Sequence, residues 1–382
     1  MIILTRIYTH DTISTHMPQH TRGKASQPQT LHDHENIKTE LEQSGGLVQL
    51  IEKVKNEYAC ILSSTQEIER ESQFPTGHDW EMLAILYDYD KETAQHSVEV
   101  FHLTREKIDK EIASWIILSE GFPSDSGISR DCFLRACLFH DIGKLTVPKE
   151  VLTNHLSDIE CAWILYENKE QARELLHKKG IVEDIFSDLT SHGFIKKILQ
   201  ALHTKNLRPQ SIIPLNMLIP SDKIDTVNKK IKPYGLTADN TLLEIMSMHE
   251  GASFQILTSM GFAKEAELAG SHHSRNRNST NTIKVGSPPM TVNLSDIIHL
   301  ADVEQAMGSK RYYKTQESQL AVLSSLVDHA ERGFVSKEIT RLWVSDELHT
   351  LQENKTYRTA ISGADATHLE HILTFLKQEK SE

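Results

Sequence analysis

A short apolar run leads directly into a histidine–aspartate pair, and this junction constrains the chain more than any other feature. Residues 133–139 read Phe-Leu-Arg-Ala-Cys-Leu-Phe, and His140, Asp141 and Lys144 follow them. The run predicts that the pair lies at the edge of a core. Imidazole and carboxylate are both ligands of divalent metals, and a nearby lysine can neutralise phosphate. Alone, the pair is weak support for a site, because two common residues meet by chance in many proteins.

The composition is that of a soluble globular protein. Of the 382 residues, 38% are hydrophobic and 25% are charged, which allows one large domain or two ordinary ones. The net charge of −12 argues against DNA or RNA binding, because neutralising a phosphate backbone needs clustered basic residues. Without a paired spacing, the cysteines are expected to be reduced, buried thiols (Cys60, Cys132, Cys137 and Cys161).

No stretch approaches the ~18 apolar residues of a membrane helix, so no membrane insertion is expected. The first residues are too briefly apolar for a secretory signal. We therefore expect a cytoplasmic location, with secretion as an effector as the alternative.

Apolar spacing predicts an almost entirely α-helical protein. Helical patterns cover about 46–68, 80–118, 242–260, 263–270, 292–307, 317–332, 337–352 and 366–377. Few segments alternate as strands do, and residues 271–289 are expected to form a polar loop. The predicted organisation is a disordered tail (1–45), a helical accessory region (46–80), a core (81–345) with an inserted helical subdomain (155–238), and a C-terminal helical extension (346–382).

Further histidines and carboxylates are candidate partners of the His140–Asp141 pair. Glu92 and His96 are four residues apart on a predicted helix, so both leave the same face. Asp302 lies among apolar residues, where an unpaired charge would be costly, so a metal or a cationic partner is expected. The remaining candidates are His249, His272 and His273. A mixed histidine and carboxylate set suits Fe, Mn, Ni or Zn better than Ca.

Each of these candidates also has an ordinary structural explanation. The pair four residues apart fits a solvated interaction on a helix surface, and His249 fits a capping or surface histidine. Asp302 fits an internal salt bridge with a nearby base (Lys310 or Arg311). His299, three residues before Asp302, is interpreted as structural. Only the joint occurrence of the candidates favours a metal site over these explanations.

The order of the elements resembles that of HD-domain phosphohydrolases, and in particular their HD-GYP subgroup. The resemblance rests on Glu-Thr-Ala-Gln-His at 92–96, His-Asp-Ile-Gly-Lys-Leu-Thr-Val-Pro at 140–148, His249, His272-His273, and Leu-Ala-Asp-Val at 300–303. The segment 310–314, Lys-Arg-Tyr-Tyr-Lys, is similar to the subgroup's Arg-x-Tyr element. Together these motifs cover about 82–155 and 240–345.

The resemblance implies an all-helical HD-domain bundle that holds two or three divalent metal ions, Fe or Mn first, with Ni or Zn as alternatives. The implied metal ligands are Glu92, His96, His140, Asp141, His249, His272, His273 and Asp302. Asp141 would bridge metals and Lys144 would contact the substrate phosphate or the attacking water, so both are candidate catalytic residues. With Lys144, the implied substrate-binding residues are Arg311 and Lys314. The implied reaction is hydrolysis of a cyclic dinucleotide such as cyclic di-GMP by metal-activated water.

Departures from the subgroup's pattern leave the substrate and the partners open. Ser274 stands where the family usually has glutamate, and the Gly-Tyr-Pro loop is missing after it. The alternatives are a phosphohydrolase for another nucleotide and an inactive metal- and nucleotide-binding sensor or scaffold. The spacing from His140 to His249 exceeds what a compact core needs, so the insertion (155–238) is a candidate lid or docking surface for a protein partner. A homodimer is the alternative assembly.

Overall fold

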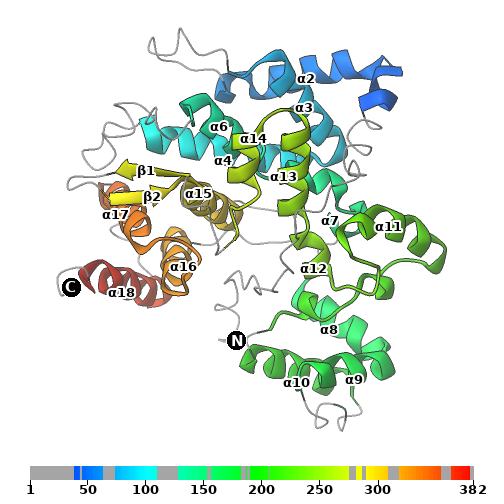
Figure 1. Cartoon of the computed structure of the whole chain (residues 1–382). Helices are drawn as coiled ribbons and strands as arrows, with labels where there is room; N and C mark the ends of the chain where they lie inside the picture. Colours follow the sequence, from blue (N-terminus) through cyan, green and yellow to red (C-terminus); the bar gives the residue numbers. More distant parts are fainter. Residues whose placement is uncertain are drawn as a thin grey trace. The chain divides into compact units, whose positions relative to one another are not determined.

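The computed structural model describes residues 38–43, 45–62, 74–109, 128–152, 156–181, 186, 190–205, 207–274, 281–285, 290–308, 318–353 and 363–378. These residues form two compact units, and Figure 1 labels their elements. The described residues of His34–Ile142 and Ser253–Glu382 form the first unit, and those of Gly143–Ala252 form the second. Helix α13 (His249–Ser259) carries the chain from the second unit back to the first.

The first unit is a helical bundle around α15. Its helices include α2 (Gly46–Leu62), α3 (Gly77–Tyr89), α4 (Lys91–Asp109), α6 (Arg130–Leu138), α14 (Ala263–Ala269), α15 (Leu294–Gly308), α16 (Gln319–Glu331), α17 (Lys337–Glu353) and α18 (Gly363–Lys377). α15 contacts α4, α14, α16 and α17, and most of its side chains are buried. A helix buried on nearly all sides is the centre of a core. The all-α bundle predicted from the sequence is confirmed.

The helical pattern predicted over 80–118 forms two helices in the described part, because the chain breaks at Asp90. Asp90 has an extended backbone, with φ −151° and ψ 101°. Its carboxylate accepts a hydrogen bond from Thr93 Oγ1 at 2.5 Å, and its carbonyl accepts one from Ala94 N. Aspartate is a favoured residue at a helix start, so Asp90 ends α3 and begins α4. Residues 110–118 of the predicted helix lie outside the described residues.

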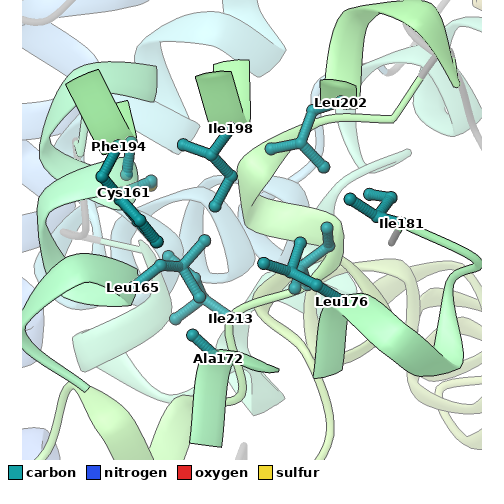
Figure 2. Close-up of a cluster of buried hydrophobic side chains, with 11 residues drawn as sticks. Cys161, Leu165, Ala172, Leu176, Ile181, Phe194, Ile198, Leu202 and Ile213 are labelled. Atoms are coloured by element: carbon teal, nitrogen blue, oxygen red, sulfur yellow. The ribbon is translucent and has the colours of Figure 1, made fainter. Parts of the chain in front are cut away.

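The second unit consists of short helices that pack around apolar clusters of their own. Its elements are α7 (Lys149–Leu152), α8 (Asp158–Glu167), α9 (Lys169–Lys178), α10 (Ser191–Thr204), α11 (Ile224–Ile231), α12 (Leu242–Ser247) and the 3-10 turns η5 (Pro209–Ser211), η6 (Leu215–Met217), η7 (Ser221–Lys223) and η8 (Lys232–Tyr234). Figure 2 shows one cluster, in which Leu165, Leu176 and Ile198 point toward a common centre. A second cluster includes Val147 and Ile231. The described residues of the predicted insertion all lie in this unit, while the predicted domain boundaries remain predictions.

A two-stranded antiparallel hairpin stands where the sequence predicted a polar loop (271–289) followed by a helix (292–307). The loop prediction is wrong for the four residues of the first strand, and the helix begins two residues later than predicted. Strand β1 (Thr282–Val285) pairs with β2 (Met290–Asn293), with Thr282 opposite Asn293. Both strands carry β-branched residues, which favour extended backbone. Leu294 N donates to Asn281 O at 2.9 Å, so the base of the hairpin sets the point at which α15 begins.

The remaining expectations that concern described residues are the N-terminal tail, the buried cysteines and the absence of a membrane helix. Residues 1–37 of the predicted tail lie outside them, and residues 38–43 are helical, with Lys38 Nζ 2.6 Å from Glu81 Oε1. The described cysteine side chains are buried and free, as predicted (Cys132, Cys137 and Cys161). Burial raises the pKa of the Cys161 thiol to about 12, so this thiol stays protonated near neutral pH. None of the described helices is long and apolar enough to cross a membrane.

Candidate metal centre

His140 and Asp141 stand directly after α6, where a buried helix ends. Ser129 starts α6 by accepting a hydrogen bond from Cys132 N at 3.1 Å, and the following apolar run is buried. Ser253 Oγ on α13 donates to the His140 carbonyl at 2.8 Å and fixes the turn. The exposed fractions of His140 and Asp141 are 0% and 2%. The pair therefore lies inside the first unit, where a carboxylate needs compensating positive charge.

The first unit brings together five of the predicted metal ligands in two overlapping groups. His96, His140 and Asp302 form one group, and His140, Asp141 and His272 form the other. Within each group the ligand atoms lie within 4.8 Å of one another. His96 Nε2 is 2.8 Å from Asp302 Oδ1 and 3.7 Å from Asp141 Oδ2. His140 Nε2 is 3.5 Å from Asp141 Oδ2 and 3.8 Å from Asp302 Oδ1.

Backbone carbonyls orient two of the imidazole rings. His140 Nδ1 lies 2.9 Å from the Cys137 carbonyl, and His272 Nδ1 lies 2.5 Å from the Ala269 carbonyl. A carbonyl only accepts hydrogen bonds, so Nδ1 carries the proton and Nε2 is the nitrogen available as a ligand. His140 Nε2 is buried and has no hydrogen-bond partner among the described residues. In a metal-binding histidine, one ring nitrogen usually donates a hydrogen bond while the other binds the metal, and these two rings have that arrangement.

Two carboxylates make the cluster a place for positive charge. Burial lowers the pKa of His140, but the charges of Asp141 and Asp302 outweigh burial and raise that pKa. Burial also raises the pKa of Asp302, but the contacts with His140 and His96 and the charge of His273 hold it well below its ordinary value. Asp302 is therefore ionised, and protons and metal ions compete for the same nitrogens. Imidazoles and carboxylates in this combination fit a borderline divalent metal ion.

His273 and His299 extend the cluster toward α16. His273 Nε2 is 3.5 Å from Asp302 Oδ2. His299 Nδ1 lies 2.9 Å from the His272 carbonyl, and its Nε2 lies 2.8 Å from His329 Nδ1. Because the carbonyl accepts from Nδ1, His299 Nε2 accepts in turn from His329 Nδ1. His299 therefore has a structural role, as interpreted from the sequence. It binds the backbone of the turn that carries the predicted ligands His272 and His273.

Two residues that position His96 were not predicted from the sequence. His96 Nδ1 is hydrogen-bonded to Gln305 Oε1, and Gln305 Nε2 donates to Glu99 Oε2. An amide oxygen accepts, so His96 Nδ1 carries the proton and its Nε2 faces Asp302. Gln305 follows Asp302 by three residues on α15, and Glu99 follows His96 by three on α4. This same-face spacing was the only signal in the sequence.

Replacing Gln305 with leucine is expected to lower the affinity for divalent metal about 10- to 100-fold, because His96 loses the acceptor that fixes its ring. Competition with a chelator of known affinity measures the effect. Gln200→Leu, at an exposed position of α10, is the matched control and should leave the affinity unchanged. Equal affinities in a folded Gln305→Leu variant and the wild type would exclude this positioning role.

The remaining predicted site residues belong to neither of these two groups. Glu92 is exposed in the first turn of α4 and belongs to neither group in the described residues. Lys144, in η3 (Ile142–Thr146), and His249 belong to the second unit. His249 Nδ1 lies 2.7 Å from the Met246 carbonyl, the same three-residue pattern that orients the other histidines. The roles of these residues remain predictions, and Lys310, Arg311 and Lys314 lie outside the described residues.

Comparison with known proteins supports the class of site that this geometry defines. Residues 93–219 match the HD domain family, whose members are generally metal-dependent hydrolases. The matched segment includes His96, the His140–Asp141 pair and Lys144, and it supports the HD-domain phosphohydrolase superfamily. Neither a curated protein nor a solved structure matches the chain. The finer HD-GYP assignment remains a prediction.

Proposed function

We propose that this protein is a metal-dependent phosphohydrolase that cleaves a phosphodiester of a cyclic dinucleotide, with cyclic di-GMP as the first substrate to test. One observation carries the proposal. The Nδ1 atoms of His96, His140 and His272 are held by acceptors, and the available nitrogens are grouped with Asp141 and Asp302. The HD domain match supports the reaction class, and the order of the sequence motifs supports the substrate.

The number of available nitrogens limits how the residues would hold metal. The Cys137 carbonyl occupies His140 Nδ1, so His140 offers one nitrogen and ligates one ion. Both ligand groups include His140, and in a centre with two or three ions Asp141 would be our candidate for the carboxylate that the ions share. A carboxylate has two oxygens and bridges readily. Fe and Mn are the proposed ions, with Ni and Zn as alternatives.

The protein's own contribution to the reaction is orientation and exclusion of water. Bound divalent metal lowers the pKa of a water molecule and neutralises charge on the phosphoryl group. The buried setting of His140 and Asp141 strengthens every electrostatic interaction with a bound phosphate. We assign Lys144 to phosphate binding, together with Arg311 and Lys314. A protein partner on residues 155–238, a homodimer and a cytoplasmic location remain predictions.

Turnover assays with purified protein test the proposed function. Cyclic di-GMP, cyclic GMP–AMP and linear dinucleotides are supplied with Mn²⁺ or Fe²⁺, and Asp141→Ala serves as the inactive control. We expect metal-dependent turnover of a cyclic dinucleotide that is lost in the variant and on chelation. Turnover of another nucleotide alone would replace the substrate but keep the reaction class. Bound metal without turnover of any substrate would overturn the enzymatic function.

A further inference from the structure

A second group of metal-type ligands lies where α16 meets α18. Asp328 and Glu331 stand on α16 and His371 stands on α18, and their ligand atoms lie within 4.8 Å of one another. Figure 1 shows the two helices side by side, and they are in contact. The two carboxylates are three residues apart, so they leave the same face of α16. None of these residues belongs to the candidate metal centre.

Ser324 holds one nitrogen of His371. Its Oγ lies 2.8 Å from His371 Nδ1, and Ser324 itself is buried. The other nitrogen, Nε2, lies 3.4 Å from Glu331 Oε2 and 3.9 Å from Asp328 Oδ1. One nitrogen of the ring is thus hydrogen-bonded to a serine hydroxyl, and the other lies among carboxylates.

The separations within this group suit a tetrahedral ion. Zinc binds histidine nitrogen and carboxylate oxygen at about 2.0–2.2 Å, which places two tetrahedral ligands about 3.4 Å apart. Charge-assisted hydrogen bonds are shorter, about 2.7–2.9 Å. The 3.4 Å separation between His371 Nε2 and Glu331 Oε2, a long hydrogen bond, equals the spacing of zinc ligands, and the 3.9 Å separation from Asp328 Oδ1 is longer than a tight ion pair.

The electrostatics of Asp328 favour an added cation. Burial raises the pKa of its carboxyl, and the nearby positive groups His371 and Arg332 only partly offset this effect. The side chains of Asp328, Glu331 and His371 are 34%, 40% and 29% exposed, so an ion can reach them from solvent. A divalent ion would neutralise both carboxylates at once.

We propose that Asp328, Glu331 and His371 bind a zinc ion that joins α18 to α16. The site supplies three protein ligands, and solvent completes the tetrahedron. Its ligands come from two helices far apart in sequence, so the ion acts as a cross-link. The site goes beyond the proposed phosphohydrolase function, because it gives the predicted C-terminal extension a metal-dependent attachment to the bundle.

Zinc binding by full-length wild type, His371→Gln and Glu331→Gln tests the site. Each protein is stripped with a chelator, loaded with zinc, desalted and analysed for metal, and its thermal midpoint is measured with and without zinc. Both variants should bind one zinc ion fewer than the wild type and should show a smaller zinc-induced rise in midpoint. His177→Gln, at an exposed position of α9, should match the wild type.

The design separates this proposal from the proposed function. The candidate centre is intact in every protein of the set, so the difference between them reports on the α16–α18 site even if the centre bound no metal. Circular dichroism of the stripped proteins should show equal helicity, because all three substituted side chains are partly or fully exposed. Equal zinc content and equal thermal shifts in the wild type and both variants would overturn the proposal.

Discussion

Asp302→Asn is expected to lower phosphohydrolase activity about a thousandfold and to remove metal from the candidate centre. Asparagine keeps the volume of the side chain but not the charge that faces His96 and His140. Bound metal supplies several kcal/mol of transition-state stabilisation, and about 1.4 kcal/mol corresponds to a factor of ten in rate. Turnover of cyclic di-GMP in the presence of Mn²⁺, together with metal analysis, measures both effects.

The matched control for this substitution stands on the same helix. Asp296 is also a buried carboxylate of α15, and it accepts a hydrogen bond from Ser336 N at 3.3 Å. Asp296→Asn should therefore keep both metal and activity. If Asp302→Asn kept the metal content and turnover of the wild type, Asp302 would not belong to the site.

Arg135→Met is expected to lower the free energy of unfolding by about 3–5 kcal/mol, because it leaves two buried carboxylates without their cationic partner. Arg135 Nε lies 2.7 Å from Asp79 Oδ1, and its Nη1 lies 3.0 Å from Glu265 Oε1. The Asp79 side chain is fully buried, and the guanidinium also stacks 4.8 Å from the Phe262 ring. This residue ties α3 and α14 to α6, the helix that ends at the metal-ligand pair.

Denaturant unfolding followed by circular dichroism measures this effect. Two further variants serve as comparisons. Arg135→Lys keeps the charge but loses the paired hydrogen bonds to Asp79, so an intermediate loss is expected. Arg173→Met breaks an exposed ion pair with Glu170 and should change stability by less than about 1 kcal/mol. A loss in Arg135→Met no larger than in Arg173→Met would contradict the structural role assigned to the buried pairs.

His140, Asp141 and Asp302 were predictable as site residues because the apolar residues around them in the sequence indicate burial. His140 and Asp141 end an apolar run, and Asp302 interrupts an apolar helix, so each places a polar group where a core is expected. Gln305 and Glu99 carry no such signal. Their role depends on α4 lying against α15, a tertiary contact that helical periodicity does not contain.

The spacing of residues in the sequence indicated which side chains share a helix face. It did not indicate how deeply a side chain is buried or where a helix ends. Glu92 and His96 share a helix face, but Glu92 is exposed in the first turn while His96 is buried one turn later. Apolar periodicity continued across Asp90, so it could not reveal that a single capping residue divides two helices. The carbonyls that orient His140 and His272 are backbone groups, and any residue at those positions could supply them.

Anomalous diffraction at a metal absorption edge, from crystals grown with Mn²⁺, tests the central claim most directly. We expect an anomalous peak bounded by His140 Nε2, Asp141 and Asp302, with the His140 Nδ1–Cys137 carbonyl hydrogen bond preserved. Ordered side chains at these positions without an anomalous peak among them would contradict the assignment of a metal centre.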